Sequence, residues 1–411
     1  GKSSCNVIFI TVIFFLSDQL DGQYHVARII TKSNRQKRVM SPQTTQEKPQ
    51  NVVIVAGEAS GDSHAARLVN ELKKLDDSIR FRGMGGDALR AAGVDVFIDM
   101  AKISVVGFVE VLKKYNLIKA ELNKLKQNIA EQPPDLLILV DFQEFNQRLA
   151  AFAKSIGIKV LFYIGPQVWA WRPKRVYKMG RIVDHMSDIM PFEKVLYDDA
   201  NVPVTFTGHP LTDEVVRDKS KQQAREQLQI ADKITVGLFP GSRSGEISKI
   251  LPILLESAKL IRKHQAQHSN AEVQFIFPVA NTIKAEDLAP FASSLEELSV
   301  ITVKDQFYDV TQSCDVILTA SGTATLEIGL LEVPMVIVYK TSAISFFIGK
   351  RLVSLTHIGL VNIIPGKEIV REFLQGDAKP PLIAEEALHL LNDEKYYESM
   401  QYELSLIRQQ L

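Results

Sequence analysis

The feature that most constrains this chain is a recurring alternation of short apolar runs with segments of helical periodicity. Three such runs stand in its first half, at Asn51–Ala56, Leu136–Val140 and Lys159–Tyr163. They are almost continuously apolar, which is typical of parallel strands that are covered on both faces. Strands of this kind joined by helices predict an α/β fold built on doubly wound parallel sheets.

A second series of short β-rich runs follows a polar helical segment at residues 220–229. These runs occupy residues 235–239, 273–278, 300–303, 316–319 and 335–339. The chain has 411 residues, more than one hydrophobic core usually organises. We therefore predict two Rossmann-like domains, at residues 51–210 and 211–380, with a hinge near Gly208-His209-Pro210 and helices at residues 381–411.

The first 50 residues differ from the rest and are predicted to lie outside the fold. An apolar run at residues 7–16 is shorter than the about 20 apolar residues that span a bilayer. Asp18 and Asp21 follow where a secretory cleavage site would need small residues, although a targeting role remains the alternative. Our hypothesis is that Met40 is the native start, which the N-terminal mass of the native protein would test.

Charge and cysteine content narrow the classes of partner. The chain carries 48 basic and 48 acidic residues, so its overall charge does not favour nucleic acid as a partner. Its two cysteines, Cys5 and Cys314, lie far apart and offer neither a metal-ligand spacing nor a disulfide framework. We therefore expect no bound metal and a reducing, cytoplasmic compartment.

Two strand ends in the first half carry acidic residues. The loop after Asn51–Ala56 has small residues suited to a strand-to-helix turn, but Glu58 and Asp62 place negative charge where a pyrophosphate would bind. This loop therefore binds hydroxyls or amines, or is a tight turn with Asp62 as N-cap. Asp141 follows the strand Leu136–Val140, where it can accept a proton from a hydroxyl or cap the next helix, expected near residues 144–148.

Two strand ends in the second half suit phosphate groups. Residues 239–247 join a strand to a helix with glycines and a positive charge, so Arg243 and the backbone N–H groups can face a diphosphate. Residues 320–327 open another helix with hydroxyls and a glycine. Glu327 lies within that helix, where its carboxylate can accept from ribose hydroxyls or favour the helix dipole.

Two further segments carry unusual apolar surface. Residues 165–172 place Trp169 and Trp171 beside prolines and basic residues, which is more apolar surface than a simple linker exposes. Residues 104–119 combine apolar residues with lysines, as interfacial helices do, with packing into the core as the alternative. The predicted lipid-facing side chains are those of Val105, Val106, Phe108, Val109, Leu112, Lys113 and Lys114.

From about Val52 to the C-terminal helices, these segments together resemble the lipid-A-disaccharide synthase family. The most specific stretches are residues 55–62, 166–172, 191–193, 206–210, 240–243, 320–327 and 360–364. The resemblance implies a variant of the GT-B glycosyltransferase architecture, an inverting reaction without metal or cofactor, and UDP held by the second domain. It also implies a cytoplasmic enzyme, peripheral at the inner membrane, and a homodimer in which the C-terminal helices pack back or are exchanged.

The substrates and roles of residues follow from the same resemblance. The donor would be UDP-2,3-diacylglucosamine and the acceptor 2,3-diacylglucosamine 1-phosphate, with a β-1,6 disaccharide and UDP as products. Asp141 is then the expected base and Glu58 an acceptor-side catalytic residue. The expected nucleotide-sugar contacts are Gly241, Ser242, Arg243, Ser321, Gly322, Thr323, Ala324, Glu327 and Asn362.

One stretch departs from the family pattern, and other functions remain open. Residues 142–146 stand where the family has a stretch richer in Asp and Pro, which puts the secondary contacts near Asp141 in question. A UDP-GlcNAc 2-epimerase or another lipid glycosyltransferase would share the scaffold but is not expected to carry the Trp169 and Trp171 loop. A non-catalytic nucleotide-sugar-binding protein would lack the carboxylate of Asp141.

Overall fold

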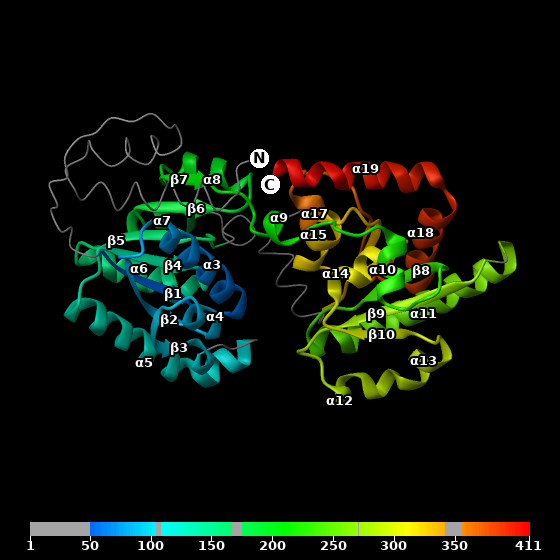
Figure 1. Ribbon diagram of the computed structural model, residues 1–411, viewed down its shortest axis with the longest axis horizontal. Helices are drawn as coiled ribbons and strands as arrows, with labels where there is room; N and C mark the ends of the chain where they lie inside the picture. Colours follow the sequence, from blue (N-terminus) through cyan, green and yellow to red (C-terminus); the bar gives the residue numbers. More distant parts are fainter. Residues whose placement is uncertain (1–49, 104–107, 167–174, 270, 342–355) are drawn as a thin grey trace. The chain divides into compact units, whose positions relative to one another are not determined.

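The computed structural model describes residues 50–103, 108–166, 175–269, 271–341 and 356–411, without the side chains of residues 102 and 108–114. Contacts within the chain divide it into one unit that ends at Pro210 and another that begins at Leu211 (Figure 1). Residues 1–49 of the predicted leader, Val105, Val106, Trp169 and Trp171 lie outside the described residues. The other predicted lipid-facing residues lie in a helix whose backbone is described, but their side chains are not described: Phe108, Val109, Leu112, Lys113 and Lys114.

The first unit is a parallel sheet of seven strands, as the apolar runs predict. The strand order is β3-β2-β1-β4-β5-β6-β7. The strands are β1 (Asn51–Ala56), β2 (Arg80–Gly85), β3 (Asp95–Asp99), β4 (Leu136–Val140), β5 (Lys159–Tyr163), β6 (His185–Asp188) and β7 (Val204–Phe206). The helices between them are α3 (Ala59–Leu75), α4 (Asp87–Ala91), α5 (Phe108–Glu131), α6 (Gln143–Ser155), α7 (Val176–Ile182) and α8 (Glu193–Asp199), with a 3₁₀ turn at Met100–Lys102.

Helices cover both faces of this sheet, which explains why its central strands are continuously apolar. Val53 and Val55 of β1 pack into the core shared with α5, α6 and α7. Val52 and Ile54 point to the opposite face and pack into the core shared with α3 and α4. Successive side chains of a strand alternate between faces, so each needs an apolar residue when both are buried.

The topology places two loops side by side at one edge of this sheet. From β1 the chain runs outward to β2 and β3 and then returns to β4 on the other side of β1. Ala56 at the end of β1 pairs with Val140 at the end of β4. This is the point where the strand order reverses, and in such sheets ligands bind beyond the carboxyl ends of the strands there.

The second unit repeats this design with six parallel strands in the order β10-β9-β8-β11-β12-β13. The strands are β8 (Ile234–Phe239), β9 (Val273–Val279), β10 (Ile301–Lys304), β11 (Val316–Ala320), β12 (Met335–Tyr339) and β13 (Glu372–Leu374). Phe239 near the end of β8 pairs with Thr319 of β11, so the loops after β8 and β11 leave the reversal point together. The expectation of two doubly wound α/β units is confirmed.

The helices of the second unit include the two that end the chain. They are α9 (Leu211–Glu214), α10 (Lys221–Gln227), α11 (Ser244–His268), α12 (Ala285–Leu288), α13 (Ala292–Glu297), α14 (Phe307–Ser313), α15 (Thr323–Leu330), α17 (Leu360–Ile363), α18 (Pro380–Asn392) and α19 (Glu394–Gln410). In this chain α18 packs on α11, and α19, red in Figure 1, packs on α15. Arg408 of α19 donates to the carbonyl oxygens of Thr212 and Val215, at 2.7 Å and 2.6 Å.

Among the described helices, none combines the length and the apolar character needed to cross a membrane.

Candidate active site

The reversal point of the first sheet brings Glu58 and Asp141 into electrostatic contact. Glu58 follows β1 and is the N-cap residue of α3, whereas Asp141 directly follows β4. The pKa of Asp141 is raised to about 6, mainly because its carboxyl is buried and secondly because of the negative charge of Glu58. A hydrogen bond from the backbone of Phe142 acts in the opposite direction and lowers this pKa. A carboxylate with this pKa is ionised at neutral pH and holds a proton more readily than an exposed aspartate.

The turn that carries Asp141 is strained and held by its neighbours. Asp141 and Phe142 have φ angles of 47° and 48°, in the left-handed region that residues with a Cβ atom rarely adopt. The amide of Asn146 donates to the carbonyl oxygens of Val140 and Asp141, at 3.2 Å and 2.8 Å. A Cβ at Gly57 would lie 2.2 Å from the Phe142 ring, so only glycine fits beside this turn.

Asp141 does not cap the helix that follows it. Helix α6 begins at Gln143, and its N-cap residue is Phe142, whose side chain makes no capping hydrogen bond. The capping alternative for Asp141 is therefore wrong, and the backbone hydrogen bond that its carboxylate accepts comes from Phe142, before the first helical residue.

The sequence suggested that Asp62 binds a hydroxyl or amine or caps α3, and the structure gives it another role. It lies inside the first turn of α3 and is only 3% exposed, so it is not the N-cap of that helix. Its carboxylate accepts from the backbone N–H groups of Gly86 at 2.7 Å and Ala88 at 3.0 Å. These contacts tie α3 to Gly86, just after β2, and to the first turn of α4. Of the two acids in the loop, only Glu58 adds charge beside Asp141.

The stretch that departs from the family pattern makes its own contact. Glu144, in the first turn of α6, forms an ion pair with Arg175, with a nitrogen-to-oxygen distance of 2.7 Å. Arg175 is the N-cap residue of α7. The departure at residues 142–146 thus places Phe142 beside Gly57 and ties the start of α6 to the start of α7.

The reversal point of the second sheet forms a pocket of about 340 Å³. The loop after β8 forms one side and the loop after β11 with the start of α15 forms the other. Eight of the nine residues predicted to contact a nucleotide sugar line it: Gly241, Ser242, Arg243, Ser321, Gly322, Thr323, Ala324 and Glu327. The structure therefore gathers residues that lie about eighty positions apart in sequence.

Glu327 contributes a partly buried carboxylate to this pocket. It is the fifth residue of α15, beyond the first turn, where the helix dipole has little effect. Tyr308 donates a hydrogen bond to it at 2.9 Å, and burial raises the pKa of Glu327 against that bond. An acceptor held in this way suits a hydroxyl group of a ligand.

Sequence reasoning missed the aromatic side of this pocket. Phe239 and Phe307 contact each other with ring centroids 5.2 Å apart, and both line the pocket. Phe307 and Tyr308 open α14 soon after β10, so adjacent aromatic residues just beyond a strand end were the available signal.

Asn362, the ninth predicted contact, does not line this pocket. It is fully buried in α17, and its amide nitrogen donates to the carbonyl oxygen of Val370 at 2.7 Å and to Glu372 at 2.8 Å. Its amide oxygen accepts from the N–H groups of Ile369 and Val370, at 2.8 Å and 2.9 Å. The side chain therefore joins α17 to the segment before β13, and these four bonds occupy its amide.

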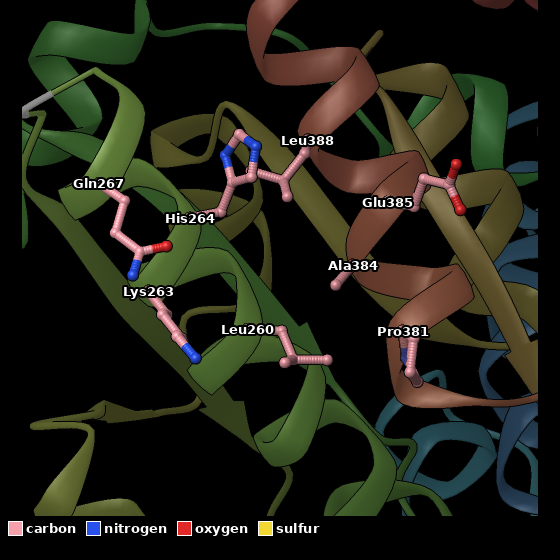
Figure 2. A pocket seen from close by; sticks show the side chains of 8 residues that line it. All are labelled: Leu260, Lys263, His264, Gln267, Pro381, Ala384, Glu385 and Leu388. Carbon is pink, nitrogen blue, oxygen red and sulfur yellow. The ribbon is translucent and has the colours of Figure 1, made fainter.

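Another hollow, of about 400 Å³, lies between α11 and α18. Figure 2 shows the side chains that line it, among them His264 of α11 and Leu388 of α18. Its lining is largely apolar and includes none of the residues that the sequence predicted for the site. The predicted catalytic residues and the predicted nucleotide-sugar residues other than Asn362 therefore lie at the reversal points of the two sheets.

Solved structures first place this fold in a class. The glycotransferase of kitacinnamycin matches with a TM-score of 0.57 and 15% identity, over 89% of this chain and 95% of that one. The UDP-GlcNAc 2-epimerase from Neisseria meningitidis bound to UDP-GlcNAc matches with a TM-score of 0.54 and 13% identity, over 88% and 98%. The chain therefore has a GT-B-like fold.

The amino-acid sequence then gives the family. The model of the lipid-A-disaccharide synthetase family matches residues 52–410. The lipid-A-disaccharide synthase of Trichlorobacter lovleyi is 44% identical over 365 residues, which cover 89% of this chain and 94% of that protein. The one from Nitrosococcus oceani is 45% identical over 361 residues, covering 88% and 92%. This chain belongs to the lipid-A-disaccharide synthetase family, as the resemblance of its motifs predicted.

Proposed function

We propose that this chain transfers 2,3-diacylglucosamine from its UDP derivative to 2,3-diacylglucosamine 1-phosphate. The products are the β-1,6-linked disaccharide 1-phosphate and UDP. The observation that carries the proposal is the carboxylate of Asp141, which stands beyond a central strand in a member of this family and has a pKa of about 6. A non-catalytic sugar-binding protein would have no need of such a group.

In the proposed reaction, the 6-hydroxyl of the acceptor attacks the anomeric carbon of the donor. The new C–O bond forms as the bond from that carbon to the diphosphate breaks, which inverts the configuration. Asp141 accepts the hydroxyl proton, and Glu58 keeps the pKa of Asp141 raised. Arg243 and the N-terminus of α15 at Gly322 and Thr323 stabilise the charge on the departing UDP.

The direct test is product formation by the purified protein. We expect disaccharide and UDP when the protein is incubated with both acylated substrates in mixed micelles. A second incubation, with UDP-GlcNAc alone, tests the epimerase alternative. That alternative would be favoured if this incubation gave 2-epimerised sugar and the first gave UDP without disaccharide. If folded protein gives neither product, the proposed function is wrong.

Replacing Glu58 by Gln is expected to move the acid limb of the pH–rate profile to lower pH. The charge of Glu58 raises the pKa of Asp141, so its removal lowers that pKa and keeps the base ionised in more acidic solution. The profile of kcat/KM against pH reports this limb for the free enzyme. Glu71→Gln, on the exposed side of the same helix, is the control, and an unchanged limb in Glu58→Gln would contradict the pairing.

We also propose that the protein is cytoplasmic, binds the inner membrane peripherally through the start of α5, and forms a homodimer. The described part of that region supports the membrane contact, because Tyr115 and Leu117 are 48% and 39% exposed. Aromatic and aliphatic side chains next to lysines are typical of segments that lie in the membrane interface.

Replacing Lys113 by Gln is expected to weaken binding to vesicles that contain anionic lipid by about fivefold, since one lysine near such a surface contributes about 1 kcal/mol. Sedimentation with vesicles measures the bound fraction. Lys124→Gln, on an exposed position further along the same helix, is the matched control. Equal loss in both variants would mean that the attraction is not localised at the start of α5.

A further inference from the structure

The phosphate-suited loop after β8 is already in contact with an anion, the side chain of Glu246. This glutamate is the third residue of α11 and lines the pocket of the second unit. Its Oε2 accepts from the backbone N–H of Ser242 at 3.0 Å, and its Oε1 lies 3.2 Å from Nη1 of Arg243. A Cβ at Gly241 would lie 2.2 Å from the same Oε2 atom, so the carboxylate is seated against the loop backbone.

These contacts use the same groups that a diphosphate would need. Backbone N–H groups at the N-terminus of a long helix and an arginine form a general site for phosphate oxygens. Arg243 is 69% exposed and contacts Glu246 near the limit of hydrogen-bond length, so its guanidinium can turn toward a ligand at little cost. A diphosphate that reaches Ser242 and Arg243 must therefore displace the carboxylate or bind beside a like charge.

We propose that Glu246 is an internal competitor of the nucleotide diphosphate. It occupies the loop when the pocket is empty, leaves Ser242 and Arg243 when the donor binds, and returns as UDP departs. Its negative charge thereby weakens UDP binding and favours product release. This inference rests on the proposed function, because it assigns the loop to the diphosphate of the donor.

A purely structural role for Glu246 predicts the opposite result. A glutamate at the third helical position often accepts from backbone N–H groups just before the helix and shapes the turn. If that were its only role, replacing it would leave UDP affinity unchanged or lower it through loss of loop order. The direction of the change in affinity therefore separates the two roles.

The test is the affinity of UDP for the Glu246→Gln variant, measured by titration calorimetry. Glutamine keeps an oxygen that can accept from Ser242 but removes the charge. We expect UDP to bind about fivefold to tenfold more tightly, which corresponds to the loss of one competing charge-assisted contact. Glu256→Gln is the matched control, because Glu256 lies on the same helix and pairs only with Lys259 among the described contacts.

Each outcome is decisive when thermal melting shows that the variants are folded. Tighter binding in Glu246→Gln with wild-type affinity in Glu256→Gln supports the competitor role. Unchanged or weaker binding in Glu246→Gln overturns it but leaves the proposed function intact, because the wild-type protein still binds UDP. No UDP binding by the wild-type protein overturns the proposed function and the inference together.

Discussion

Replacement of Asp141 by Asn is expected to lower turnover by on the order of 10²–10⁴ while UDP binding is retained, the range for loss of a positioned base. Asparagine keeps the size of the side chain and tolerates the left-handed backbone found at this position. It cannot accept the proton of the attacking hydroxyl. Turnover is measured as disaccharide formed per enzyme, and UDP binding by calorimetry.

The control for this variant lies at the opposite end of the same strand. Asp135 precedes β4, where its carboxylate accepts from the backbone N–H of Asn51 at 2.7 Å. Asp135→Asn makes the same chemical change at the opposite end of β4 and should leave turnover near the wild-type value. Near-normal turnover in Asp141→Asn would remove Asp141 from the reaction.

The Asp141→Asn variant should also be more stable than the wild-type protein at pH 8. The pKa of Asp141 is about 6 in the folded chain against an ordinary value of 3.8, so folding disfavours its ionised form. A raised pKa contributes stability that is complete below the unfolded value and is lost as the pH rises through the folded value. The gain in Tm of Asp141→Asn should therefore stay nearly constant from pH 8 to about 6 and shrink as the pH falls from about 6 towards 3.8.

Replacement of Asn362 by Ala is expected to lower the free energy of unfolding by about 3–4 kcal/mol, because it leaves several buried polar groups without partners. The groups that lose their partner are the N–H groups of Ile369 and Val370 and the carbonyl of Val370. The carboxylate of Glu372 loses one hydrogen bond but keeps those from the N–H groups of Ile358 and Gly359. Urea unfolding followed by circular dichroism measures the change.

Asn392→Ala is the control for Asn362. Asn392 accepts one hydrogen bond, from Gln265 at 3.2 Å, so its loss should cost about 1 kcal/mol or less. At a temperature where both variants are folded, Asn362→Ala should retain its KM for the donor. A raised KM with nearly normal stability would show instead that Asn362 contacts the nucleotide sugar.

Much of the fold could be predicted because central strands in a doubly wound sheet need apolar residues on both faces. Strands β1, β4, β5 and β12 were predicted with their observed bounds. Five others were missed, namely β2, β3, β6, β7 and β13. They are short or polar, as in the His-Met-Ser-Asp sequence of β6, so they lack the continuous apolar run. These segments are strands because of their backbone pairing with neighbouring strands, which is a tertiary contact.

The amino-acid sequence by itself determined the two α/β units, the loops at the strand ends and the residue types suited to phosphate or to proton transfer. Only the tertiary structure decided which of these residues meet. The order of the strands puts Glu58 beside Asp141 and directs Asp62 to the turn before α4. It also brings the hydroxyl of Tyr308 to the carboxylate of Glu327, and the amide of Asn362 to the backbone of Val370. Such contacts depend on crossovers between distant segments, whereas local periodicity reports only which faces of an element are buried.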